Sequence, residues 1–389
     1  MEGDFIKLNK WLLPLSWLYG MGVRLRNTMF DIGILKERTF SIPVISVGNI
    51  TVGGTGKTPH VEYLVEMLSP HCNVAVLSHG YKRKSKGFIK ATVDTPMTDI
   101  GDEPYQMKQK FPNVTIAVDK DRCHGIDLLT ADDERLDVVL LDDAFQHRYV
   151  KPGVNILLVD YHRLVIYDRL LPVGRLREPL SGKDRADIVI VTKCPSDLTP
   201  MQYRVITKAM DLYPYQRLYF TTISYGQLRP LFSDATEEVT HDALKNLNTL
   251  LLTGIGSPEQ MQHDLAPRCL TVTPLTFSDH HNFNAKDVIR INDAFAALPV
   301  PRIILTTEKD ATRLSGVEGL SDDVRRSLYV APIEIRFMLE KEYTFNNQIL
   351  DYVHKNSRHS ILVKAKDDFK PQDGNHSGDR PRTISFRNN

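Results

Sequence analysis

The residues with the clearest chemical role lie in one glycine-rich segment, "GGTGKT", from Gly53 to Thr58. It follows an apolar run, 42–47, that is typical of a buried strand, and it precedes a stretch that we predict to be helical. Backbone amides in a glycine turn and at a helix start can cradle an anion. Lys57 can reach the β- and γ-phosphates of a nucleotide, and the Thr58 hydroxyl can bind Mg²⁺. The segment therefore predicts a phosphate loop.

One position departs from the usual pattern of such loops. G-x-x-x-x-G-K-[ST] begins with glycine, whereas this sequence has Thr51 there. Gly48 or the Gly53–Gly54 pair could supply the tight turn by another path. The alternative is a glycine-rich turn without a ligand, but a lysine and a threonine at a helix start favour nucleotide binding. The predicted nucleotide-binding residues are Thr51, Val52, Gly53, Gly54, Thr55, Gly56, Lys57 and Thr58.

Two carboxylates follow a second apolar strand. In "LDVVLLDDAFQH", Asp142 and Asp143 come directly after the apolar residues, where a phosphate-loop protein carries the carboxylate that holds Mg²⁺. Alone, the pair would be better explained as solvated aspartates that cap the next helix. Beside a phosphate loop, it predicts a magnesium site formed by Thr58, Asp142 and Asp143.

Candidate acids and bases lie in two further segments. "GDEP" sets Asp102 and Glu103 at a predicted helix start, where Asp102 is either an N-terminal cap or a general base for a hydroxyl. "FSDHH" carries Asp279, His280 and His281, and no cysteine or spaced histidine accompanies them to form a metal site. A histidine paired with a carboxylate can tune a base, whereas two surface histidines are the simpler alternative.

Two basic segments could contact phosphate. "GYKRKSKG" includes Arg83, and "LLPVGRLREP" includes Arg175 and Arg177. An arginine near a phosphate loop can stabilise transition-state charge, whereas a solvated charged loop is the alternative for the first segment.

The elements that must position these residues alternate along the chain. Val-, Ile- and Leu-rich strands separated by helices are typical of a parallel sheet buried on both faces, so we predict an α/β fold of the phosphate-loop NTPase type, doubly wound, with a second, smaller α/β domain. The predicted domains are 1–226, 227–353 and a polar, disordered tail, 354–389. The predicted strands are 42–47, 74–78, 114–118, 137–141, 154–159, 187–192, 217–223, 247–256, 301–310 and 328–337, and the predicted helices include 57–69, 102–110 and 200–212.

Composition limits the class of protein. The chain has 389 residues, a net charge of +1 and four scattered cysteines, which argues against nucleic-acid binding and a disulfide framework. No apolar run is long enough to span a bilayer. Residues 11–30 combine tryptophans and leucines with flanking basic residues, so a helix at about 8–30 either lies on a membrane or packs on the core.

Several motifs in one order carry a family resemblance. "SVGNITVGGTGKTP", "GYKRKSKG", "GDEP", "LDDAFQHR", "LLPVGRLREP", "FSDHH" and "LTTEKDA" together resemble the tetraacyldisaccharide 4′-kinases, the lipid A 4′-kinase family. The resemblance implies ATP- and Mg²⁺-dependent phosphorylation of the 4′-hydroxyl of a tetraacylated glucosamine disaccharide 1-phosphate, which gives lipid IVA. It also implies a peripheral or monotopic enzyme on the cytoplasmic face of a Gram-negative inner membrane. We infer no obligate protein partner.

The resemblance also assigns roles to residues. Lys57 matches the phosphate-binding lysine, Asp102 the catalytic aspartate, His280 its assisting histidine and Arg177 the arginine of "LREP". The family's loop also lacks the first glycine, so Thr51 fits. Ala144 and His79 depart from the usual glycine and arginine. Residues predicted to support the site or to contact substrate are Glu103, His147, Arg83, Arg175 and Asp279.

Two rival functions share these motifs. A phosphate-loop NTPase that acts as a switch or delivers a cargo would use the same lysine and aspartates, and it predicts nucleotide turnover without a lipid acceptor. A nucleotide-binding scaffold that recruits partners through its N-terminal helix predicts that loss of Asp102 leaves function intact.

Overall fold

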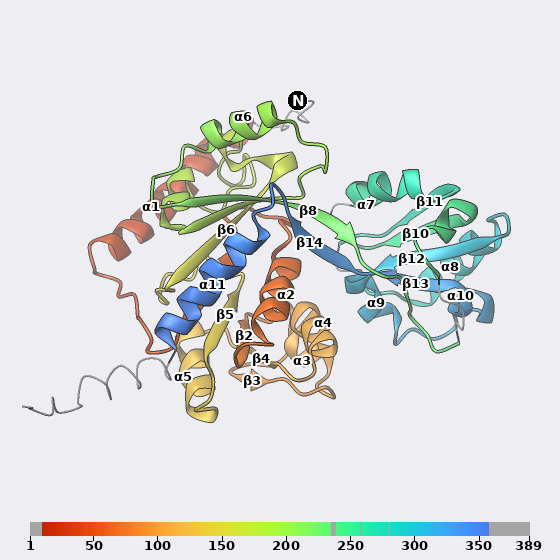
Figure 1. The fold of residues 1–389 in the computed structure, drawn as a ribbon, viewed down its shortest axis with the longest axis horizontal. Coiled ribbons are helices and arrows are strands. Elements are labelled where there is room, and N and C mark those ends of the chain that lie inside the picture. Colours follow the sequence, from red (N-terminus) through yellow and green to blue (C-terminus); the bar gives the residue numbers. More distant parts are fainter. Residues whose placement is uncertain (1–9, 235–238, 257, 280, 358–389) are drawn as a thin grey trace, which may run out of the picture.

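The protein is described by a computed structural model that covers residues 10–234, 239–256, 258–279 and 281–357. It contains two β-sheets, one on each side of a narrow connection, with helices packed against both (Figure 1). The predicted α/β class is confirmed, because most strands in both sheets run parallel and are joined through helices.

The larger sheet has nine strands in the order β14-β8-β7-β6-β1-β5-β2-β4-β3. The strands from β8 to β4 pair in parallel, and the two edge strands pair antiparallel. The central strands are apolar along their length because helices cover both faces. Their bounds are β1 Val44–Gly48, β2 Val74–Ser78, β3 Ile89–Lys90, β4 Thr115–Val118, β5 Val138–Asp142, β6 Val154–Asp160, β7 Ile188–Thr192, β8 Arg217–Tyr225 and β14 Ile333–Phe337.

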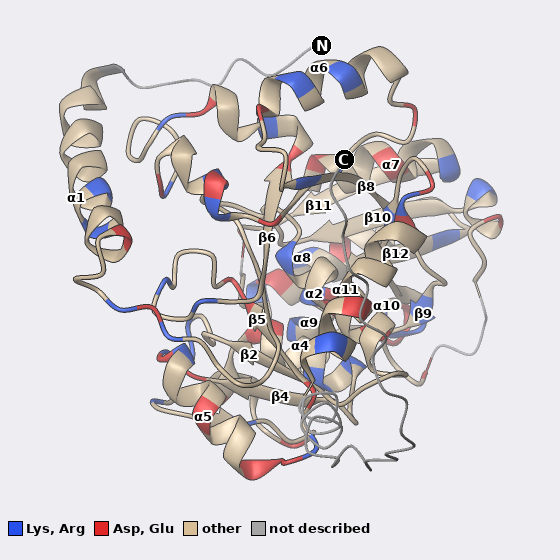
Figure 2. Ribbon diagram, turned by 60° about the vertical axis from the view of Figure 1, so that its left-hand side comes forward, with Lys and Arg blue, Asp and Glu red and all other residues tan. Residues whose placement is uncertain are grey.

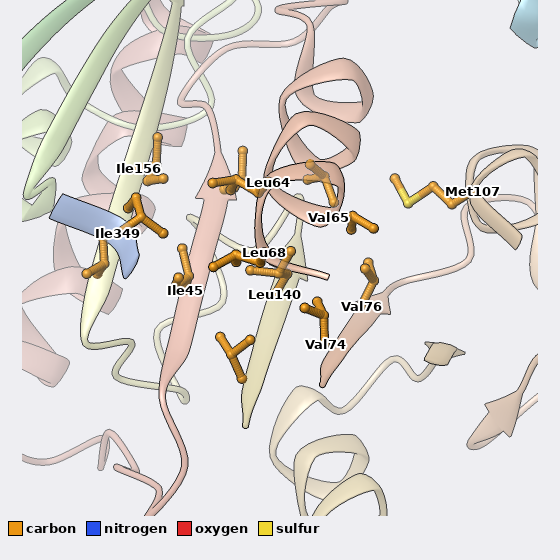
Figure 3. Packing of buried hydrophobic residues seen from close by; sticks show 14 of the residues in the cluster. Ile45, Leu64, Val65, Leu68, Val74, Val76, Met107, Leu140, Ile156 and Ile349 are labelled. Carbon is orange, nitrogen blue, oxygen red and sulfur yellow. The ribbon is translucent and has the colours of Figure 1, made fainter. Parts of the chain in front are cut away.

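Helices cover the larger sheet on both faces. One face packs on α2 and α11 through side chains such as Leu64, Leu68 and Ile349 (Figure 3). The other face packs on α5 and α6, through Ile126 and Ile206 among others. The helices are α1 Leu13–Asp31, α2 Lys57–Leu68, α3 Met97–Ile100, α4 Asp102–Lys110, α5 Arg122–Asp132, α6 Pro200–Met210 and α11 Glu342–Asn356, with 3₁₀ turns at Lys10–Leu12, Tyr161–Arg163, Val165–Tyr167 and Leu180–Arg185.

The smaller sheet has five strands in the order β11-β10-β12-β13-β9. Two apolar clusters cover its faces, one that includes Phe295 of α8 and one that includes Leu265 of α7. The strands are β9 Arg229–Pro230, β10 Asn248–Thr253, β11 Thr271–Thr276, β12 Arg302–Thr307 and β13 Leu328–Ala331. The helices are α7 Pro258–Leu265, α8 Ala285–Ala296, α9 Glu308–Leu314 and α10 Asp322–Ser327, with 3₁₀ turns at Ala243–Asn246 and Ala266–Arg268.

The chain returns to the larger sheet before it ends, which differs from the predicted second domain, 227–353. The predicted strand 328–337 is two strands: β13 belongs to the smaller sheet, and β14 pairs antiparallel with β8 in the larger one. Helix α11 then packs on the larger sheet through Phe345 and Val353. The smaller domain, about 229–331, is therefore inserted between β8 and β14. Helix α11 extends to Asn356, and 358–389 of the predicted tail lie outside the described residues.

Phe345 gives a test of this returning segment. Its ring is 1% exposed, and its centroid lies 4.4 Å from that of Phe337 and 5.3 Å from that of Tyr219. We expect Phe345→Ala to lower the free energy of unfolding by about 3–5 kcal/mol, because it removes a buried ring and leaves a cavity. Urea unfolding would measure the loss. Tyr343→Ala, on the exposed face of the same helix, is the control, and equal stabilities for the two variants would contradict this packing.

Candidate active site

The glycine-rich segment connects β1 to α2 as the sequence predicts. Gly53 has a φ of 123° and Gly56 a φ of 82°, values that residues with a Cβ rarely adopt. The buried His60 ring of α2 lies with Nδ1 2.7 Å from the Gly56 carbonyl oxygen. Burial lowers the pKa of His60 to about 4, so the neutral ring donates its Nδ1 proton to this carbonyl. The turn is thus held at the point where the helix begins.

The structure explains why threonine occupies the usual glycine position. Thr51 pairs antiparallel with Leu176, the Val52 amide donates to the Arg175 carbonyl at 2.8 Å, and the Arg177 amide donates to the Ile50 carbonyl at 2.8 Å. The chain therefore leaves β1 in an extended, strand-like conformation that threonine favours. The tight turning is done further on, by Gly53 and Gly56.

Residues at the ends of β6 and β7 hold the phosphate loop in place. The Thr192 hydroxyl, at the end of β7, donates to the Thr55 carbonyl at 3.0 Å. Lys193 donates to the Gly54 carbonyl and pairs with Asp160, at the end of β6, at 2.8 Å. Because the C=O and N–H of a trans peptide point in opposite directions, the amide after Thr55 points away from β7. These contacts fix the loop before any anion binds.

The two predicted metal ligands lie beside Lys57. Asp142 ends β5 and accepts a hydrogen bond from the Ser78 hydroxyl at 3.0 Å, and Asp143 follows with a left-handed φ of 46°. Lys57 Nζ is 3.7 Å from Asp143 Oδ1. Among the described residues, the buried Oδ1 atoms of both aspartates accept no hydrogen bond. Buried carboxylate oxygens left in this way suit a divalent cation, so the residues fit Mg²⁺.

The electrostatics of Asp142 fit the same role. Burial, followed by the negative charges of Glu103 and Asp143, raises the pKa of Asp142 to about 7, against the opposing effect of Lys57. A site that disfavours its own carboxylate charge is stabilised when a cation enters.

Arg177 connects the phosphate loop to the acidic pair. Its Nε donates to the Thr51 carbonyl at 2.8 Å, and its Nη2 donates to the Asn49 side chain at 2.8 Å and lies 3.6 Å from Asp143 Oδ1. Gln146 accepts from the same guanidinium at 3.3 Å. Asn49 and Gln146 were not predicted as site residues, although Asn49 lies in the motif "SVGNITVGGTGKTP" and Gln146 lies in "LDDAFQHR". Their uncharged side chains offered no chemical signal.

Asp102 begins α4, and the N-cap position is taken by Gly101, whose φ is 89°. The alternative that Asp102 serves as the N-cap is therefore wrong. Its Oδ2 instead accepts hydrogen bonds from Arg313 of the smaller domain. Glu103, the next residue, pairs with Lys309 of the same helix, α9, at 3.4 Å.

Of the two predicted histidines, the structure describes only His281. His280 lies outside the described residues. The neighbouring His281 stacks on Phe277, with ring centroids 5.0 Å apart, and its Nε2 is 2.8 Å from Asp287. These contacts give His281 a role in fixing its own loop. Asp279 lies in that loop, next to Gly256 of the β10–α7 turn.

Three further predicted residues make mainly local contacts. Arg83 donates to the Gly87 and Val118 carbonyls, at 2.8 and 3.5 Å, and so shapes the basic loop. The Arg175 amide donates to Asp168 at 3.2 Å. His147 is half-buried, and burial followed by the Arg122 charge lowers its pKa to about 4.

A buried arginine behind the acidic pair was not predicted. Arg122, the first residue of α5, donates to the Asp142 carbonyl at 3.1 Å and the Asp119 carbonyl at 2.8 Å, and it contacts His79 Nδ1 at 3.3 Å. Burial, followed by the charge of Arg122, lowers the pKa of His79. The residue that departs from the family pattern thus packs against a cation as a neutral ring.

Known proteins resemble this chain over nearly its whole length. A model of the tetraacyldisaccharide-1-P 4′-kinase family matches residues 8–354. The chain belongs to this family. It is 57% identical to the tetraacyldisaccharide 4′-kinase of Phocaeicola vulgatus over 92% of this chain and 99% of that protein. It is 50% identical to the Bacteroides fragilis enzyme of the same name over 95% of this chain and 100% of that protein. The predicted family and the prediction of a kinase are confirmed.

A solved structure agrees with the family assignment. The crystal structure of LpxK from Aquifex aeolicus in complex with ATP has a TM-score of 0.66 and 32% sequence identity, and the match covers 88% of this chain and 98% of that one. The family fold therefore extends over both sheets of this member.

Proposed function

We propose that this chain transfers the γ-phosphoryl group of ATP to the 4′-hydroxyl of a tetraacylated glucosamine disaccharide 1-phosphate. The observation that carries the proposal is the grouping of two cations around Asp143 at the phosphate loop, where Asp143 Oδ1 lies 3.7 Å from Lys57 Nζ and 3.6 Å from Arg177 Nη2. The names of the relatives supply the acceptor, and the ATP complex of the Aquifex protein supplies the donor.

The chemistry follows from the side chains. A sugar hydroxyl is a weak nucleophile, so Asp102 accepts its proton while the 4′-oxygen attacks the γ-phosphorus in line with the leaving oxygen of ADP. Lys57 and Arg177 stabilise the charge that develops on the transferred group. Thr58, Asp142 and Asp143 would hold Mg²⁺. When bound, the ion neutralises charge on the β- and γ-phosphates.

Helix α1 supports a membrane-facing role. Trp17 is 67% exposed and is joined on the helix by exposed side chains such as Leu18 and Leu25. Figure 2 draws most of α1 without charge, in contrast to the mixed charges elsewhere. Among the described residues, no helix has the length and hydropathy needed to cross a bilayer. We propose peripheral attachment to the cytoplasmic face of the inner membrane, where the exposed Lys82, Lys84 and Lys86 each contribute about 1 kcal/mol near anionic lipid.

Helix α1 also contacts the site, so membrane attachment and catalysis share one surface. The Tyr19 hydroxyl donates to the Arg177 carbonyl at 2.8 Å, and the Ser16 hydroxyl donates to the Leu170 carbonyl at 2.9 Å. A lipid-anchored acceptor would therefore meet the phosphate loop close to the bilayer surface.

Trp17→Glu tests the attachment. We expect the variant to bind anionic vesicles roughly tenfold more weakly or worse, because it loses the burial of a large apolar side chain. Vesicle sedimentation would measure the binding, with Tyr343→Glu on the distant helix α11 as the control. Equal binding by both variants would contradict attachment through α1.

Transfer of label tests the function itself. The protein is incubated with γ-labelled ATP, Mg²⁺ and the disaccharide 1-phosphate in detergent micelles, and lipid and nucleotide products are separated. We expect label in the lipid and ADP release that depends on the acceptor. Equal ADP release without acceptor, and no labelled lipid, would favour the NTPase alternative.

A further inference from the structure

The α9 segment "TTEKDATR" has a role that sequence analysis did not assign. Thr307, Asp310 and Arg313 are spaced by three residues and lie on one side of the helix start. Thr307 is the N-cap: its hydroxyl accepts from the Asp310 amide at 3.1 Å and donates to the Asp310 carboxylate at 2.7 Å. Arg313 Nη1 then lies 3.3 Å from Asp310 Oδ1, and the two side chains are 2% and 0% exposed. The three residues form one buried polar row.

Arg313 extends this row to Asp102 in the larger domain. Its Nε donates to Asp102 Oδ2 at 3.0 Å, and its Nη2 donates to the same oxygen at 2.5 Å. Two charge-assisted bonds from a rigid guanidinium restrict the rotation of the Asp102 carboxylate.

Asp310 anchors the arginine to the strands of the smaller sheet. Asp310 Oδ2 accepts from the Gly254 amide at 2.9 Å, directly after β10. A Cβ on Gly254 would lie 2.9 Å from Asp310 Oδ1, so only glycine permits this approach. The guanidinium is thus anchored in the smaller domain, whereas Asp102 belongs to the larger one.

A cleft lies beside this contact. It has a volume of about 500 Å³ and is lined by Met97 and Tyr105 from the larger domain and by Phe283, Thr312 and Arg313 from the smaller one. Arg313, the partner of Asp102, therefore borders a space that is formed by both domains and is large enough for part of a sugar substrate.

We propose that Arg313 is a positioning residue for the catalytic base. Through its two bonds to Oδ2, it orients the Asp102 carboxylate that receives the proton of the acceptor hydroxyl, and it does so from the smaller domain. In this step the O–H bond of the acceptor breaks and an O–H bond to the Asp102 carboxylate forms, while the 4′-oxygen bonds to the γ-phosphorus and the bond from that phosphorus to the leaving oxygen of ADP breaks. The inference rests on the proposed function, because it requires Asp102 to be the base.

A double-mutant cycle distinguishes positioning from a general structural role. Arg313→Met, Asp102→Asn and the double variant are compared with the wild type for the rate of lipid phosphorylation at saturating substrates and for the KM of ATP. We expect Arg313→Met to lower kcat by about 10- to 100-fold and to change the KM of ATP by less than twofold, because the phosphate loop is untouched. In the Asp102→Asn background, Arg313→Met should change kcat by less than about twofold, since the residue it positions is gone.

Two further variants complete the design. Arg313→Lys keeps a cation but loses the fork, so it should recover only part of the activity, and it replaces the methionine variant in the cycle if that protein does not fold. Arg325→Met removes another arginine of the smaller domain, one that pairs with Asp234, and should keep wild-type activity. Losses that multiply in the double variant would overturn the inference. An unaffected Asp102→Asn protein would instead overturn the role of Asp102 in the proposed function.

Discussion

Asp102→Asn is expected to lower kcat for lipid phosphorylation by about 10²–10⁴-fold, the usual contribution of a general base. The amide keeps the size of the side chain and can still accept a hydrogen bond from Arg313, but it cannot take a proton at neutral pH. ATP affinity should stay within about twofold, because Asp102 lies on α4 and makes no described contact with the phosphate loop.

Single-turnover transfer and equilibrium nucleotide binding would separate the two effects. Asp99→Asn, in α3 just before Asp102, is a matched control, and its carboxylate accepts a local hydrogen bond from the Thr98 hydroxyl at 3.3 Å. Retention of wild-type kcat by Asp102→Asn would assign the base elsewhere.

We expect Asp142→Asn to lower kcat and to raise the stability of the metal-free protein. Loss of a metal ligand is expected to lower kcat at least about 100-fold. Because burial and neighbouring carboxylates raise the folded-state pKa of Asp142 to about 7, its contribution to stability is fully present below its ordinary pKa. That contribution is lost as the pH rises through the folded-state value. At pH 8 without Mg²⁺, the variant should therefore be more stable than the wild type, on the order of a few kcal/mol.

Thermal unfolding at pH 4.5 and pH 8, with and without Mg²⁺, would check this expectation. The stability difference between the two proteins should be small at the lower pH and large at the higher one. Added Mg²⁺ should raise the Tm of the wild type at pH 8 and leave that of the variant nearly unchanged. Parallel pH profiles for both proteins would contradict the raised pKa.

The parts of the site that follow strands directly were predictable from sequence. The turn before Lys57 and the acids after β5 each join a local pattern to a chemical residue type, and parallel strands bring their carboxyl ends to one edge of the sheet. Helix α4 begins at Asp102, as predicted. Each of these patterns lies within a few consecutive residues, so it can be recognised without knowing which distant segments contact it.

The parts that depend on distant pairing were not predictable. Pro332 alone separates β13 from β14. The charged residues Glu334 and Arg336 distinguish β14 from the buried β13, but no local signal indicates which sheet each strand joins. Arg122 lies 20 residues from Asp142, and Arg313 lies 211 residues from Asp102, so only the fold brings each arginine to its carboxylate residue. The role of Thr51 likewise depends on its pairing with Leu176.

The insertion of the smaller domain also sets an order of events during synthesis. The larger sheet lacks its last strand and the cover of α11 until roughly 100 further residues have followed β8. At ribosomal speeds of about 5–20 residues per second, this takes about 5–20 s. During that interval the face that later receives Ile349 and Val353 is open on the nascent chain. The inserted domain has its own sheet and core and is fully synthesised before β14 and α11, so the larger domain is the last to be completed, by its C-terminal helix.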